Sequence, residues 1–189
     1  KIVKQLTAGI GFLFKKNKIT HIQGSAAFID NKTIKVAASE GEKNYTATNF
    51  IIATGSTSIA IEAIPVDEKK IVTSTGALAL ESVPKSLLVI GGGYIGLEMG
   101  SVWSRLGAKV TVVEALDRIV PTMDEEIAKE FMKSLKKQGL EFKLSHKVIS
   151  TKAGKSGIDV LMESSDKKAI NEKYDVVLMS VGRKPNTDG

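Results

Sequence analysis

The stretch that decides the fold of this chain is Leu87-Leu88-Val89-Ile90-Gly91-Gly92-Gly93-Tyr94-Ile95-Gly96. Its four apolar residues predict a strand that runs directly into the pattern Gly-x-Gly-x-x-Gly, and the residues that follow predict an amphipathic helix. A second apolar run, residues 110–113, predicts another strand and ends at Glu114, about 20 residues after Gly93. This succession is typical of a dinucleotide-binding βαβ unit.

The three glycines of the pattern have separate tasks in such a unit. Gly91 allows a sharp turn off the strand, Gly93 leaves room for a pyrophosphate to reach the backbone, and Gly96 lets the helix pack closely on the strand. Unpaired amides in the first turn of the helix carry partial positive charge and attract the phosphates. We therefore expect the cofactor-binding segment to comprise Gly91, Gly92, Gly93, Tyr94, Ile95 and Gly96.

The acid at the end of the second strand predicts which dinucleotide binds. The Glu114 carboxylate can accept hydrogen bonds from the hydroxyls of an adenosine ribose, but it would repel the 2′-phosphate of NADP. Ala115 and Leu116 offer no compensating cation, and Arg118 is the only nearby candidate. The prediction is therefore NAD rather than NADP.

Composition argues against several other functions. The chain has 189 residues, of which 42% are hydrophobic, so it can bury a core, and it has no cysteine for disulfide or thiol chemistry. Its net charge of +6 comes from 27 basic residues scattered among 21 acidic ones, and only 5% of residues are aromatic, which is unlike a nucleic-acid-binding surface. No apolar run approaches the roughly 18 residues of a bilayer-spanning helix. We expect no nucleic-acid partner, no membrane partner and no metal site.

Residues 71–181 are expected to form an α/β domain with a parallel sheet. Its predicted strands are residues 87–90, 109–114, 140–144 and 175–181, and residues 157–170 predict an inserted β-hairpin. The helix after the glycine pattern is predicted to bury an apolar stripe made of Ile95, Met99, Val102, Trp103 and Leu106. A helix near residues 124–137 is predicted to bury a stripe made of Ile127, Phe131 and Leu135.

Residues 1–70 predict a different kind of structure. Apolar periodicity over residues 1–18 predicts a helix, and short pieces at residues 19–23, 26–30, 33–37 and 45–48 predict a small antiparallel β-meander. Residues 50–53 predict an apolar strand that ends in a turn-prone segment. At the other end of the chain, residues 182–189 are predicted as a loop.

Four segments resemble the dihydrolipoamide dehydrogenase family of flavoprotein disulfide oxidoreductases. They are residues 53–56 (Ala-Thr-Gly-Ser), the glycine-rich residues 91–101, residues 112–121 with Asp-Arg-Ile-Val-Pro, and residues 181–187. The resemblance covers essentially the whole chain. It implies a Rossmann-like NAD-binding domain at residues 71–181, part of an FAD-binding domain at residues 1–70, and the return to the FAD domain at residues 182–189.

The same resemblance implies roles for individual residues. Glu114 would bind the adenosine ribose, Val148 would line the adenine pocket, and Gly182 would lie beside the nicotinamide. Ile95 and Glu98 would lie beside the nicotinamide and the flavin, with Glu98 paired to a lysine next to the redox cysteines. The FAD would contact Ala26, Thr54, Gly55 and Ser56.

Members of this family oxidise dihydrolipoamide through a redox disulfide and FAD, and pass a hydride to NAD in 2-oxo acid dehydrogenase complexes such as the pyruvate dehydrogenase complex. The resemblance implies a lipoyl-bearing acyltransferase partner, a homodimeric parent enzyme, and a cytoplasmic location, with the mitochondrial matrix as the alternative. The redox cysteine pair, an N-terminal FAD-binding glycine motif and the interface domain are missing from this sequence. We therefore expect a central fragment with no catalytic residue and no lipoamide turnover by itself.

Two other functions stay open at this stage. A non-catalytic NAD-binding module would need the same glycine pattern and acid, and another flavoprotein disulfide reductase would share the architecture. A comparison of NAD with NADP binding would separate the latter from dihydrolipoamide dehydrogenase. The two histidines, His21 and His146, are interpreted as structural or surface groups.

Overall fold

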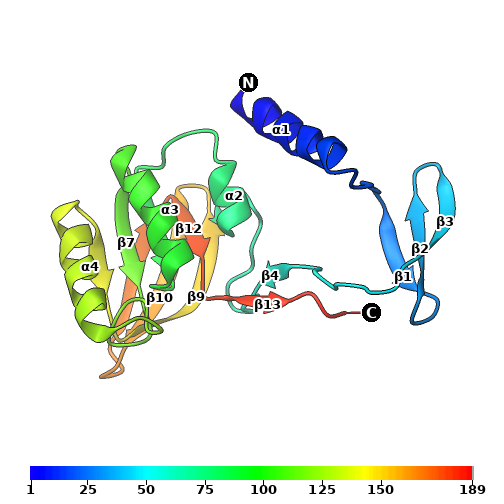
Figure 1. The fold of residues 1–189 in the computed structure, drawn as a ribbon. Coiled ribbons are helices and arrows are strands. Elements are labelled where there is room, and N and C mark those ends of the chain that lie inside the picture. The colour runs from blue at the N-terminus through cyan, green and yellow to red at the C-terminus, as the bar shows by residue number, and fades with distance from the viewer. Residues whose placement is uncertain (189) are drawn as a thin grey trace. The chain divides into compact units, whose positions relative to one another are not determined.

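The computed structural model describes residues 1–188 of the chain (Figure 1). They form two compact units, Lys1–Ala53 and a second that starts at Thr54. The second unit therefore begins before residue 70, where the sequence predicts the domain boundary, because the segment after Ala53 pairs with residues near the C-terminus. The assignment of FAD and NAD to separate domains stays a prediction.

The first unit contains one helix and one antiparallel sheet. Helix α1 covers Ile2–Lys16, as its apolar periodicity predicts, and none of its residues is buried. Strands β1 (Ser25–Phe28), β2 (Thr33–Ala38) and β3 (Gly41–Thr46) pair in the order β1-β2-β3. The predicted meander is confirmed.

Two strand predictions in this unit are wrong. Residues 19–23 and 50–53 are not strands, and the side chains of Ile51 and Ile52 are 93% and 73% exposed. An apolar run forms a strand only where a neighbouring strand satisfies its backbone N–H and C=O groups. Among residues 1–53, no strand is paired with either segment.

The second unit is built on a five-stranded parallel sheet in the order β5-β12-β6-β7-β8. Its strands are β5 (Ile71–Val72), β6 (Ser86–Ile90), β7 (Lys109–Val113), β8 (Glu141–Lys143) and β12 (Val176–Met179). The helices between them are α2 (Ser74–Leu78), α3 (Tyr94–Arg105) and α4 (Glu125–Lys137). The predicted α/β class with a parallel sheet is confirmed.

Three layers enclose the core of the second unit. Alternate residues of β6 face opposite sides of the sheet: Leu87 and Val89 pack with residues of α3 and α4, whereas Leu88 and Ile90 pack with a second sheet. This sheet is antiparallel, in the order β11-β10-β9. Its strands are β9 (His146–Gly154), β10 (Gly157–Ser164) and β11 (Ala169–Tyr174).

The structure contains two features that the sequence does not predict: a third strand in the antiparallel sheet and a separate two-stranded ladder. The predicted hairpin is present as β10 and β11, and β9 adds a third strand that the sequence analysis does not include. The prediction of residues 182–189 as loop is wrong in part, since β13 (Arg183–Pro185) pairs with β4 (Ser56–Ser58). These two strands have only three residues each and lack apolar alternation, so neither carries a strand pattern.

The predicted buried stripes of α3 and α4 are also partly wrong. Helix α3 buries Gly96, Leu97, Gly100 and Trp103, while Val102 and Leu106 are exposed and Ile95 and Met99 are only partly buried. Helix α4 buries Ala128 and Leu135, whereas Ile127 and Phe131 are exposed. Small residues permit close approach of a helix to a sheet, so each helix turns a glycine or alanine toward the strands.

Within residues 1–188, no helix is both long and apolar enough to cross a lipid bilayer. Over the same residues, no three side chains of His, Cys, Asp or Glu lie together in a group that could hold a metal ion.

Candidate functional site

The glycine bend (residues 91–93) joins the end of β6 to the start of α3. Gly91 has a φ of +103°, and a Cβ added there would lie 2.6 Å from the Ser180 carbonyl oxygen. Its N–H donates to the Val113 carbonyl oxygen at 2.8 Å, which fixes the bend to the end of β7. A Cβ added at Gly96 would lie 2.4 Å from the Gly91 carbonyl oxygen. The sharp turn and the close helix packing predicted for these two glycines are therefore both present.

Gly93 is the open position of the bend. It is the N-cap residue of α3, no side chain caps this helix, and a Cβ added at Gly93 would have nothing within 4 Å. Amides of the first helical turn lie here, at the positive end of the helix dipole. An anionic group can approach the backbone at this point without displacing a protein atom.

Glu114 lies directly beside the glycine bend. Its Oε2 accepts a hydrogen bond from the Gly92 N–H at 2.6 Å, and its Oε1 accepts one from the Leu116 N–H at 2.8 Å. Each carboxylate oxygen has a second lone pair for a further donor. The tertiary structure therefore brings the predicted acid and the predicted bend together.

A cavity of about 520 Å³, here called the bend cavity, opens over these groups. Five of the residues predicted to bind cofactor line it: Gly91, Gly93, Tyr94, Ile95 and Glu114. Gly182 lines it as well, with a φ of +128°. Gly92, in the middle of the bend, and Gly96 are both buried and do not line this cavity.

A second cavity of about 290 Å³, here called the strand-end cavity, adjoins the first. Gly91, Glu114 and Val181 line both. The buried Val148, predicted to line an adenine pocket, lies in its wall. Its wall also contains His146 and Lys147, which the sequence analysis did not select. Both follow the end of β8, and the carboxyl ends of neighbouring parallel strands share one edge of a sheet, so that position could have indicated them.

Two of the residues predicted to lie near the flavin, Glu98 and Ala26, are exposed and line neither cavity. Glu98 is exposed on α3 and does not line either one. Ala26 is exposed on β1 of the first unit. Their predicted contacts with the flavin stay predictions.

Thr54, Gly55 and Ser56 form part of a crossing between distant segments of the chain. Thr54 Oγ1 donates to the Asn186 carbonyl oxygen at 2.7 Å, and Asn186 Nδ2 donates to the Thr54 carbonyl oxygen at 3.0 Å. The Arg183 guanidinium donates to Ser56 Oγ at 2.7 Å and also to the Ser56 carbonyl oxygen. The two segments thus lie side by side as β4 and β13 (Figure 1).

Arg118 does not reach the cavity that Glu114 lines. Its Nη2 donates to the Pro121 carbonyl oxygen at 2.9 Å, and it lines a different cavity, together with Glu125 and Lys129. Arg118 therefore does not neutralise the negative charge that the Glu114 carboxylate places in the bend cavity.

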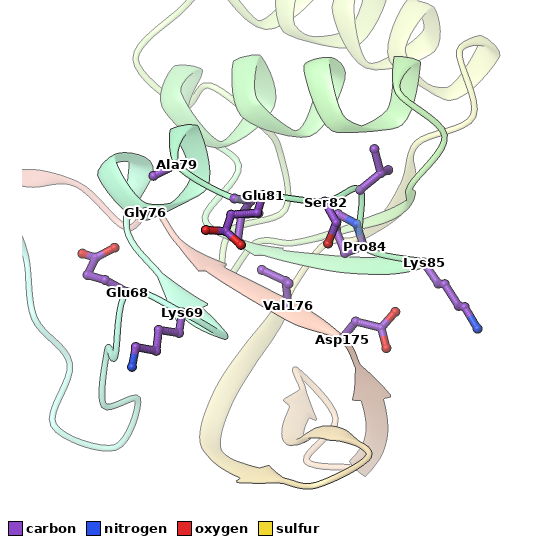
Figure 2. A pocket seen from close by; sticks show the side chains of 12 residues that line it. Glu68, Lys69, Gly76, Ala79, Glu81, Ser82, Pro84, Lys85, Asp175 and Val176 are labelled. Atoms are coloured by element: carbon purple, nitrogen blue, oxygen red, sulfur yellow. The ribbon is translucent and has the colours of Figure 1, made fainter.

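A further cavity, of about 690 Å³, lies at the other end of the parallel sheet, where strands β6 and β12 begin (Figure 2). Glu68 accepts hydrogen bonds from the N–H and hydroxyl of Thr73, and Asp175 accepts them from Ser86. Glu68 thus holds a local turn in place, whereas Asp175 joins the starts of the neighbouring strands β12 and β6. None of the predicted cofactor-binding residues lines this cavity.

The whole chain, residues 1–189, matches the family model described as pyridine nucleotide-disulphide oxidoreductase. The chain belongs to this family. Members with curated names include the mitochondrial dihydrolipoyl dehydrogenase of Pisum sativum, which is 51% identical over 192 residues. The leghemoglobin reductase of Glycine max is 50% identical over 192 residues. Both alignments cover 100% of this chain but only 38% and 36% of the relatives' lengths.

Two solved structures share the fold of this chain. LpdA from Mycobacterium tuberculosis superimposes with a TM-score of 0.86 at 25% identity, over 100% of this chain and 42% of that one. The HOCl-induced flavoprotein disulfide reductase RclA from Escherichia coli gives a TM-score of 0.75 at 28% identity, over 98% of this chain and 43% of that one. The chain thus spans less than half the length of these relatives.

Proposed function

We propose that the second unit binds NAD in the bend and strand-end cavities, as the NAD-binding part of a dihydrolipoyl dehydrogenase. One observation carries this proposal: the open backbone at Gly93, at an uncapped helix start, shares a cavity with the Glu114 carboxylate. The first suits a pyrophosphate and the second suits ribose hydroxyls.

The two cavities divide the dinucleotide between them in this proposal. The adenosine half occupies the strand-end cavity, with its ribose at Glu114 and its adenine against Val148. The nicotinamide half extends through the bend cavity toward Ile95 and Gly182. The negative charge of Glu114 disfavours the 2′-phosphate of NADP.

The activity of the whole enzyme is part of the same proposal. Curated relatives named dihydrolipoyl dehydrogenase are 51% and 48% identical to this chain in sequence. We therefore infer that the whole enzyme oxidises dihydrolipoamide, with NAD as the hydride acceptor and FAD as the intermediate carrier. Ala26, Thr54, Gly55 and Ser56 would contact the FAD, and Glu98 would pair with a lysine beside the redox cysteines. A lipoyl-bearing acyltransferase would be the partner of a homodimeric enzyme, and the mitochondrial relatives favour the matrix over the cytoplasm.

The experiment is titration of the purified protein with NAD, for wild type and for Gly93→Ala. Gly93 has φ −78° and ψ 174°, which alanine adopts freely, and the new methyl group meets no protein atom. It would occupy the space of the pyrophosphate, so we expect NAD affinity to fall about tenfold or more, since each charge-assisted bond to phosphate contributes about 1.5–3 kcal/mol. Gly11→Ala in α1, where an added methyl group is equally free of contacts, is the matched control.

The outcomes separate the candidate functions. Equal NAD affinity of Gly93→Ala and wild type would remove the bend from the binding site. NADP binding equal to or tighter than NAD binding would favour another flavoprotein disulfide reductase. NAD binding by a complete protein that lacks lipoamide turnover would favour a non-catalytic module.

A further inference from the structure

His146 is held in one orientation at the wall of the strand-end cavity. Its ring Nδ1 lies 2.6 Å from the Leu144 carbonyl oxygen, and its backbone N–H donates to the Glu114 carbonyl oxygen at 3.0 Å. The second bond places this histidine directly beside the residue proposed to bind the ribose. The imidazole is partly buried, and it is one of the polar side chains in the wall.

The contact with Leu144 fixes the role of each ring nitrogen. A carbonyl oxygen can only accept a hydrogen bond, so Nδ1 carries the proton in this contact. In the neutral imidazole the other nitrogen, Nε2, then has a free lone pair and acts as an acceptor.

The other polar side chains in this wall are less suited to accept a hydrogen bond from a base. The wall is mainly apolar; among the described residues that line it, the polar side chains are Glu114, His146 and Lys147. The Lys147 ammonium can only donate. Both carboxylate oxygens of Glu114 already accept backbone N–H groups, and their remaining lone pairs serve the ribose in the proposed site.

We propose that Nε2 of His146 accepts a hydrogen bond from the exocyclic N6 amine of the adenine, so that His146 determines selectivity for an amino-purine dinucleotide. This inference rests on the proposed NAD site and adds a residue to it. An apolar pocket with few polar groups discriminates strongly when one of them is paired with a specific substrate group.

The test compares NAD with nicotinamide hypoxanthine dinucleotide, in which an oxygen replaces the N6 amine. Binding of both dinucleotides is measured by calorimetry at pH 8. We expect wild type to prefer NAD by about tenfold, because the oxygen would face the Nε2 lone pair. In His146→Phe this preference should disappear, and in His146→Gln, whose amide oxygen can accept, it should remain.

The matched control is His21→Phe, at the other histidine of the chain, which lies in the first unit with its ring 5.6 Å from that of Phe14. It should keep the wild-type preference. If wild type binds both dinucleotides with nearly equal affinity, the inference is overturned, even if no variant folds. It is also overturned if His146→Phe still binds NAD more tightly than the hypoxanthine dinucleotide. In both cases tight NAD binding leaves the proposed function intact, whereas absence of NAD binding by wild type refutes that function itself.

Discussion

Glu114 and Gly92 are joined by a hydrogen bond of 2.6 Å from the backbone N–H to the carboxylate Oε2. The acid that the sequence predicts as a ribose ligand therefore also stabilises the bend that would receive the pyrophosphate. A Cβ added at Gly92 would lie 3.2 Å from the Glu114 Cβ, so the two residues are in close contact. The acid expected to bind the sugar and the backbone expected to bind the phosphates are thus linked directly by a hydrogen bond.

Glu114→Ala is expected to weaken NAD binding by about 1–3 kcal/mol and to narrow the difference between NAD and NADP, because it removes a charged acceptor and a repulsive charge together. Calorimetric titration with both nucleotides measures this. Glu141→Ala, at the opposite end of the neighbouring strand β8, removes the same charge away from the cavities and is the control. Unchanged affinity in Glu114→Ala would exclude this acid from the site.

Gly96→Ala is expected to destabilise the second unit by about 1–3 kcal/mol, since the new methyl group would lie 2.4 Å from the Gly91 carbonyl oxygen and 2.6 Å from Ser180 Oγ. Urea denaturation measures the change. Gly100→Ala on the same helix is the control, because its methyl group would meet Val110 Cγ1 at 3.3 Å and its gain in helix propensity of about 1 kcal/mol offsets that contact. Equal stability of the two variants would contradict the close packing at Gly96.

Asp67 provides a pH-dependent contribution to stability. Partial burial alone would raise the pKa of its carboxyl, but the N–H groups of Lys69, Lys70 and Ile71, at 2.8–2.9 Å, outweigh burial and hold that pKa below its ordinary value. A group with a lowered pKa in the folded state stabilises the fold above its unfolded pKa of about 3.9, and the contribution is lost as the pH falls through the folded pKa.

Asp67→Asn should therefore lower the melting temperature at pH 7, and the difference from wild type should shrink as the pH falls below about 4. Thermal denaturation over pH 3–7 measures it. Asp117→Asn, an exposed acid, controls for the change of net charge. A difference that stays constant over this range would show that the charge of Asp67 is not what stabilises the turn.

Local patterns predicted the parts of the fold whose determinants are close in sequence. The βαβ unit followed from β6, the three glycines and the run into Glu114, and the meander followed from its short alternating strands. The buried faces of α3 and α4 were predicted less well. Hydrophobicity selected Val102 and Ile127, whereas the sheet accepts the small Gly100 and Ala128, and only packing against the strands reveals that preference.

The sequence by itself determined the family resemblance, the glycine bend and the acid expected beside it, because each depends on a residue type at a fixed spacing. The tertiary structure alone decided that residues 50–53 are not a strand, that β13 pairs with β4, and that His146 and Lys147 share a cavity with Glu114. The physical reason is that strand pairing and cavity walls require contacts between segments far apart in the chain, and no local spacing encodes them.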